Sequence, residues 1–231
     1  KHGYDYNKRD GYPNVFFHNF LLSEMDAYFA SLGLGPEVIG YLSGDTDWLL
    51  TRAVKGEDCI HPEYLADPSR LAETMARMLY DLHHRDHSGC PIQDHTARYL
   101  TRATENYRAG SYDASLFPDN WGYATAEDAW KDVQTYGPYL KNDTLLHGDY
   151  CLPNIFAENG RLSGFIDLGD SGIADRYQDI SLCYRSLAWN MDGSYGGRVR
   201  EGFDPDRLFD ALGITPDREL LRYYRLLDEL F

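Results

Sequence analysis

The stretch HGDYCLPN, residues 147–154, decides which fold this chain adopts. A short apolar run at 155–157 follows it directly, and a second apolar run covers 162–166. Between the two runs stands the dipeptide Asn159-Gly160, which suits the tight turn of a β-hairpin because both residues tolerate positive φ angles. The sequence therefore predicts a β-hairpin, with polar residues gathered at one end of its two strands.

Three polar side chains meet at that end of the predicted hairpin. Asp149 and Asn154 belong to the loop before the first strand, and Asp167 directly follows the second strand. Phosphoryl transfer requires a carboxylate that accepts the proton of an acceptor hydroxyl, and oxygen ligands that hold magnesium on the nucleotide phosphates. We therefore predict that Asp149 is the catalytic base and that Asn154 and Asp167 are the metal ligands. His147 is interpreted as a structural residue that holds the loop through hydrogen bonds to the backbone.

Each of these three polar residues also has an ordinary structural interpretation. An aspartate after a glycine is usually a turn residue, an asparagine before a strand is usually a cap, and an aspartate after a strand often caps a helix. The joint pattern favours the chemical interpretation, because unrelated turn and cap residues would rarely fall in this order around a hairpin.

Composition and charge restrict the classes of function. The chain has 231 residues, of which 43% are hydrophobic, enough for the core of one large domain or of a domain with a small lobe. Its net charge of −15 would repel nucleic acid and attract a cationic small molecule, although an acidic surface also serves solubility. No apolar stretch approaches the roughly 20 residues of a membrane span. The four cysteines contain no Cys-x-x-Cys pair, so we expect reduced thiols in a cytoplasmic protein.

The rest of the chain predicts a small α/β part followed by a mostly helical body. Apolar residues recur at helical spacing over 21–32, and two strands then flank the turn at 43–45. We expect an α+β fold divided into residues 1–54 and 55–231. The two strands cover 38–42 and 48–54, and the helices of the body cover 68–82, 94–108, 125–136, 177–190, 205–212 and 217–230.

Around the hairpin, the chain resembles the aminoglycoside phosphotransferases, most closely the 3′-phosphotransferase branch that includes the neomycin and kanamycin kinases. The similar segments are HGDYCLPN at 147–154, SGFIDLG at 163–169, ADRYQDI at 174–180, the tail YYRLLDELF at 223–231 and WLLT at 48–51. The resemblance implies a bilobal, protein-kinase-like fold with a mostly helical C-terminal lobe that carries the catalytic hairpin. It implies transfer of the γ-phosphate of ATP or GTP, with Mg²⁺, to the 3′-hydroxyl of an aminoglycoside, which confers antibiotic resistance. A choline- or sugar-kinase-like enzyme and a truncated, non-catalytic remnant that binds aminoglycosides are the alternatives.

The resemblance also assigns roles on the nucleotide side. The backbone of Arg52, Ala53 and Val54 would contact the nucleotide base at the hinge between the lobes. Glu24 would pair with the phosphate-binding lysine, and Arg185 would lie near the phosphates.

On the drug side, the resemblance implies carboxylates that face the amino groups of a cationic aminoglycoside. These are Asp119, Glu229 and the terminal carboxylate of Phe231. The net charge of −15 would then serve substrate binding.

The sequence departs from the family pattern at two places. Little chain precedes Glu24, so we expect an incomplete N-terminal lobe, and the phosphate-binding lysine is Lys8, Lys1 or a residue upstream. Asp170 stands where the family usually has a basic residue, and metal binding or substrate preference could differ as a result.

Overall fold

The computed structural model describes residues 14–16, 20–44, 48–115 and 122–230, with side chains from Glu24 onwards. The predicted α+β class is confirmed, with helices and small antiparallel sheets in the order that the sequence indicates. Among the described residues, no helix is both long enough and apolar enough to cross a membrane.

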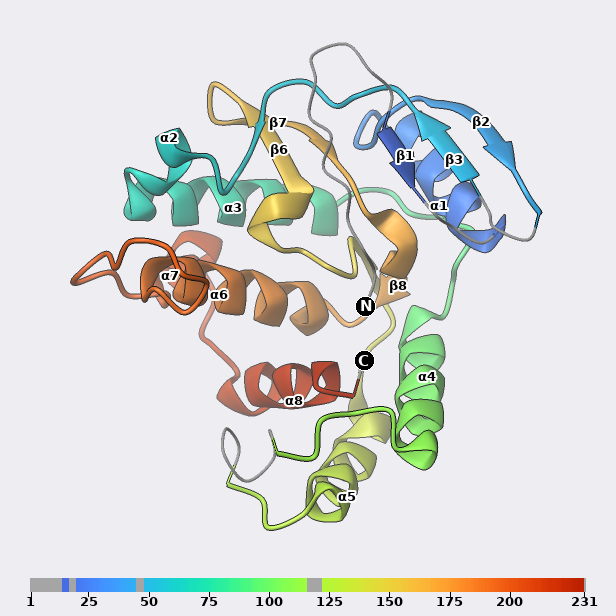
Figure 1. Cartoon of the computed structure of the whole chain (residues 1–231), viewed down its shortest axis with the longest axis vertical. Helices are drawn as coiled ribbons and strands as arrows, with labels where there is room; N and C mark the ends of the chain where they lie inside the picture. Colours follow the sequence, from blue (N-terminus) through green and yellow to red (C-terminus); the bar gives the residue numbers. More distant parts are fainter. Residues whose placement is uncertain (1–13, 17–19, 45–47, 116–121, 231) are drawn as a thin grey trace.

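The first part of the chain is a three-stranded antiparallel sheet that lies beside one helix (Figure 1). The strand order is β1-β3-β2, so the strand that comes last along the chain lies in the middle. Met25 and Phe29 of the helix are fully buried, because they lie four residues apart on one helical face. The elements are β1 (Asn14–Phe16), α1 (Phe20–Ser31), β2 (Val38–Leu42) and β3 (Trp48–Thr51).

Two features of this part differ from the prediction. The sequence pattern did not indicate β1, and β3 ends at Thr51 rather than at residue 54. The backbone N–H of Arg52 still donates to the carbonyl of Glu37 at 2.8 Å, and the chain then leaves the sheet. The division of the chain after residue 54 stays a prediction.

The predicted hairpin is confirmed and lies against α3 at one end of the second part (Figure 1). Strands β6 (Ile155–Glu158) and β7 (Arg161–Phe165) pair antiparallel, and β4 (Glu57–Asp58) adds to the outer edge of β6. Asn159 and Gly160 form the turn with φ angles of 53° and 70°, as the dipeptide predicts. A separate two-stranded sheet pairs β5 (Thr144–Leu146) with β8 (Gly172–Ala174).

The six predicted helices of the body are present, each with bounds within two residues of the prediction, whereas a short helix at 62–65 was not predicted. Asp67 accepts a hydrogen bond from the backbone N–H of Arg70 at 3.1 Å and starts α3, with Pro68 in the first position. Asp94 caps α4 in the same way, and Gly110 ends it in the left-handed conformation. The helices are α2 (Pro62–Leu65), α3 (Pro68–His83), α4 (His95–Ala109), α5 (Ala126–Tyr136), α6 (Tyr177–Met191), α7 (Arg207–Leu212) and α8 (Arg218–Asp228), with 3₁₀ turns η2 (Gly137–Tyr139), η3 (Leu152–Asn154) and η4 (Leu168–Asp170).

The two parts are joined at the end of the hairpin that the polar residues occupy. The backbone N–H of Phe165 donates to the carbonyl of Leu34 at 2.7 Å. The rings of Phe29 and Phe165 meet edge to face at 6.3 Å, and α1 packs against η4. The first part of the chain therefore contacts the turn that directly follows Asp167.

Candidate active site

Asp149 lies in a loop that holds its carboxylate from both sides. The thiol of Cys151 donates to Oδ1 at 2.9 Å, and the side-chain amide of Asn154 donates to Oδ2 at 2.8 Å. The same amide also donates to the backbone carbonyl of Asp149 at 3.0 Å. The buried His147 accepts from the backbone N–H of Asp149 through Nδ1 at 3.2 Å, as expected of a residue that holds the loop. The carboxylate is therefore fixed in one orientation before any ligand binds.

The loop with Asp149 packs directly on the turn that begins at Asp167. A Cβ on Gly148 would lie 1.5 Å from the carbonyl oxygen of Asp170, and the φ angle of Gly148 is +87°. Only glycine fits there. The backbone N–H of Ile166 donates to the carbonyl of Asn154 at 3.0 Å, which links the two strand ends. The structure thus brings the segments of Asp149, Asn154 and Asp167 together at one end of the hairpin.

The environment of Asp149 raises the pKa of its carboxyl group above the ordinary value. Burial is the main cause, since it disfavours the charged form, and the charges of Asp167 and Asp228 add to it. The hydrogen bond from Cys151 acts in the opposite direction. Two carboxylates, Asp167 and Asp228, therefore lie close enough to Asp149 to act on its titration.

The donor set at this end of the hairpin fits magnesium. Because the amide nitrogen of Asn154 faces Asp149, its oxygen is left for a cation, and Asp167 adds a carboxylate. Within the described residues, no group of three or more His, Cys, Asp or Glu side chains could hold a metal ion. Two oxygen ligands suit magnesium, which keeps several waters and binds the substrate phosphates.

Asp179, at the start of α6, holds this loop and was not singled out from the sequence. Its fully buried carboxylate accepts from the backbone N–H groups of His147 at 2.9 Å and of Gly148 at 2.8 Å. It also contacts Nε2 of His83 at 3.2 Å. Its place in the segment at 174–180, which carries part of the family resemblance, was the sequence signal that could have identified it.

The residues predicted on the nucleotide side lie on or next to the first part of the chain. Glu24 is an exposed residue of α1, the helix that packs on η4. Arg52, Ala53 and Val54 form the connection between β3 and β4, and the side chain of Arg52 pairs with Glu37 at 2.7 Å. Their roles toward a nucleotide stay predictions, and Lys8 and Lys1 lie outside the described residues.

Arg185 lies on α6, where its guanidinium forms an ion pair with Asp228 and covers the ring of Trp189 at 5.2 Å. Burial lowers the pKa of Arg185, but the charge and hydrogen bond of Asp228 outweigh it and leave the pKa raised. The sequence predicts Arg185 near the phosphates, and its pairing with Asp228 was not predicted. Arg185 holds a carboxylate of the C-terminal tail beside Asp149, and its role toward the phosphates stays a prediction.

Of the residues predicted to bind the drug, the structure describes Glu229, which lies on the C-terminal tail. Glu229 is half-buried at the end of α8, directly after Asp228. The backbone carbonyl of Leu230 accepts from the amide of Asn106 on α4 at 2.7 Å, which holds the tail in place. Asp119 and Phe231 lie outside the described residues, so their assignment stays a prediction.

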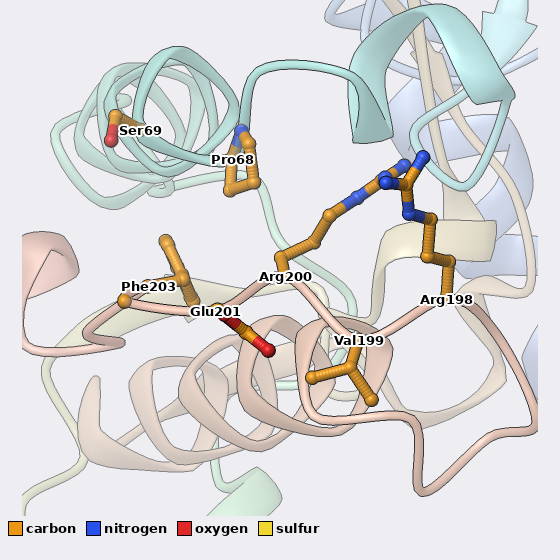
Figure 2. Close-up of a pocket in the computed structure, with 8 residues that line it drawn as sticks. Pro68, Ser69, Arg198, Val199, Arg200, Glu201 and Phe203 are labelled. Atoms are coloured by element: carbon orange, nitrogen blue, oxygen red, sulfur yellow. The ribbon is translucent and has the colours of Figure 1, made fainter.

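A hollow on the surface lies away from this site. It encloses about 610 Å³ between the start of α3, at Pro68 and Ser69, and the segment 198–203 (Figure 2). Arg198 and Arg200 both line it (Figure 2). Its lining, as far as the chain is described, contains none of the predicted site residues.

Solved structures share this architecture. An aminoglycoside 3′-phosphotransferase of type VIII matches with a TM-score of 0.77 and 24% identity, over 94% of this chain and 84% of that one. An aminoglycoside phosphotransferase of Streptomyces rimosus, in complex with ADP and streptomycin, matches with a TM-score of 0.76 and 22% identity, over 96% and 87%. At these identities the likeness establishes the fold.

Sequence relatives establish the family. A probable aminoglycoside 3′-phosphotransferase of Lactococcus lactis is 37% identical over 211 residues, which are 90% of this chain and 77% of that protein. An aminoglycoside 3′-phosphotransferase of Escherichia coli is 32% identical over 190 residues, 81% of this chain and 66% of that protein. Residues 23–224 match the phosphotransferase enzyme family. The chain therefore belongs to this family, on its aminoglycoside 3′-phosphotransferase branch.

Proposed function

We propose that this protein transfers the γ-phosphate of a nucleoside triphosphate to the 3′-hydroxyl of an aminoglycoside, and that it confers resistance to the drug. The observation that carries the proposal is the Asp149 carboxylate, held by Cys151 and Asn154 at the hairpin end next to Asp167. We also propose a cytoplasmic location, which four free cysteines support.

In the proposed reaction Asp149 orients the acceptor hydroxyl and accepts its proton. The hydroxyl oxygen forms a bond to the γ-phosphorus, and the bond from this phosphorus to the β–γ bridging oxygen breaks. The two hydrogen bonds on the carboxylate support this role, because a carboxylate held in one orientation needs little reorganisation when the acceptor arrives. Asn154 and Asp167 would hold Mg²⁺, which would neutralise charge on the phosphates.

The carboxylates near Asp149 support a cationic acceptor. Asp228 and Glu229 are consecutive residues on the tail next to the site, and the chain carries a net charge of −15. Amino groups on the acceptor gain both attraction and orientation from such a surface. A neutral sugar would be neither attracted nor oriented by these carboxylates.

The proposal is tested by incubating the protein with ATP and Mg²⁺ and with kanamycin, neomycin or choline, followed by mass spectrometry of the products. We expect a single added phosphate on the aminoglycosides and its position at the 3′-carbon by NMR. Phosphorylation of choline alone would replace the proposal with a choline-kinase-like function. Tight drug binding without transfer to any acceptor would make the protein a non-catalytic binder.

Asp149→Ala should lower kcat by about 1,000-fold or more, because transfer then lacks its proton acceptor, and should leave drug binding nearly intact. The drug affinity is measured by calorimetry. Asp192→Ala, which removes an exposed carboxylate after α6, is the control and should keep the wild-type rate. If Asp149→Ala kept most of its activity, Asp149 would not be the catalytic base.

A further inference from the structure

Arg102, on α4, holds the side chain of Asp170 in a two-pronged ion pair. Its Nη1 donates to Oδ1 at 2.8 Å, and its Nη2 donates to Oδ2 at 3.1 Å. This parallel arrangement fixes direction as well as distance. The two side chains are 47% and 35% exposed, so solvent screens the pair and its contribution to folding stability is small. The acidic charge at position 170 is therefore neutralised by a residue of another helix.

Asp170 lies where the turn after Asp167 packs against the loop that carries Asp149. It is the last residue of η4, the turn that begins directly after Asp167, and its carbonyl oxygen packs against the Cα of Gly148. Asp167 itself has a left-handed backbone with φ of 59°, which a non-glycine residue keeps only when its neighbours hold it. A residue that fixes Asp170 therefore also fixes the turn from which Asp167 projects.

Helix α4 can hold Asp170 in place, because one face of this helix contacts Asp170, Gln178 and the C-terminal tail. His95 meets the side chain of Gln178, whose amide donates to the carbonyl of Gly148 at 3.0 Å. Further along the helix, Tyr99 and Asn106 contact the C-terminal tail. The contacting residues on this face follow helical spacing. They are His95, Tyr99, Arg102 and Asn106.

We propose that Arg102 is a positioning residue for phosphoryl transfer. By holding Asp170, it keeps the Asp167 turn in register with the Asp149 loop, so that the metal ligand and the base face the same phosphate. The proposal rests on the proposed function of this site and adds to it a residue that touches neither substrate nor metal.

The kinetic test compares Arg102→Ala, Asp170→Ala and the double variant with the wild type. Each single variant should lower kcat by about tenfold and change the KM for the drug by less than about threefold, because chemistry is misaligned while the drug surface stays. The double variant should be no slower than either single one, because both changes remove the same ion pair. Arg102→Lys should recover part of kcat, since one of the two contacts can re-form.

Arg218→Ala is the matched control. Arg218 forms a similar two-pronged pair with Asp206, and these side chains are 49% and 37% exposed. This pair joins α8 to the residue that precedes α7, away from Asp149. The variant should keep the wild-type kcat. An equal loss of kcat in Arg218→Ala and Arg102→Ala would overturn the proposal, because a general loss of stability would then explain both.

Hydrogen exchange gives a readout that needs no turnover. Backbone amides of residues 168–172 should exchange at least about fivefold faster in Arg102→Ala than in the wild type, and at an unchanged rate in Arg218→Ala. Unchanged exchange together with unchanged kcat in Arg102→Ala would overturn the role of Arg102. Absence of drug phosphorylation by the wild type would instead overturn the proposed function, and faster exchange at 168–172 would still support Arg102 as the residue that holds the turn.

Discussion

The proposed catalytic loop, residues 147–154, and the exposed edge between α5 and α8 are held in place by opposite kinds of contact. In the loop, the contacts are short, buried and made largely to backbone atoms, and both His147 and Asp179 are fully buried. At the exposed edge between α5 and α8 the contact joins surface side chains: Arg222 and Asp132 lie 3.5 Å apart, and their side chains are 45% and 44% exposed. The first arrangement fixes atoms in place, whereas the second adjusts at little cost when solvent or a ligand competes.

Gly148→Ala tests the most tightly packed point of the catalytic loop and should have the largest effect. The new Cβ would overlap the carbonyl of Asp170 at a φ angle that alanine avoids, so we expect a loss of about 4 kcal/mol or more in unfolding free energy, with loss of activity. Gly160→Ala is the control, since its φ is also positive but no atom lies within 4 Å, and it should cost about 1 kcal/mol. Urea unfolding measures both, and equal losses would contradict the packing argument.

Asp179→Ala removes the acceptor that holds the catalytic loop from α6. Two buried backbone N–H groups would lose their partner, so we expect a loss of about 3 kcal/mol in unfolding free energy. The amides of His147 and Gly148 should also exchange faster. If their exchange stayed at the wild-type rate while turnover fell, Asp179 would act in some way other than holding the loop.

Burial of His95 should make the free energy of unfolding depend on pH. Burial is the main cause that lowers the pKa of His95, from its ordinary value of 6.5 to about 4. The unfolded chain therefore binds a proton first as pH falls, and stability present above pH 6.5 is lost towards pH 4. The loss amounts to at most about 3 kcal/mol, at 1.36 kcal/mol per pKa unit.

His95→Gln should flatten this pH dependence, measured as urea unfolding between pH 7 and pH 4.5. The control is His84→Gln, which changes an exposed histidine after α3 and should keep the wild-type slope. A slope that persists in His95→Gln would assign the dependence to the carboxylates instead.

Arg222→Ala tests the exposed side of the comparison and should have the smallest effect. The ion pair with Asp132 and the contact with the ring of Tyr123 at 4.9 Å are both open to solvent. We expect a change within about 0.5 kcal/mol in unfolding free energy, measured by thermal unfolding. A loss above 2 kcal/mol would show that this surface is held as firmly as the catalytic loop.

Features that depend on neighbouring residues could be read from the sequence. The dipeptide Asn159-Gly160 predicts the hairpin turn, and Asp67 with Pro68 predicts the start of α3. These signals work because a turn or a cap involves atoms only a few residues apart. The short strand β1 was not predicted, since three residues carry too little periodicity to be distinguished from a loop.

The sequence by itself determined the catalytic candidates at the hairpin, because Asp149, Asn154 and Asp167 flank two consecutive strands that one tight turn brings together. Only the tertiary structure decided what holds them. Asp179 reaches His147 across 32 residues of chain, and Arg102 reaches Asp170 across 68. Such partners depend on how helices pack, and helix packing follows from the shape of the whole core rather than from any local pattern.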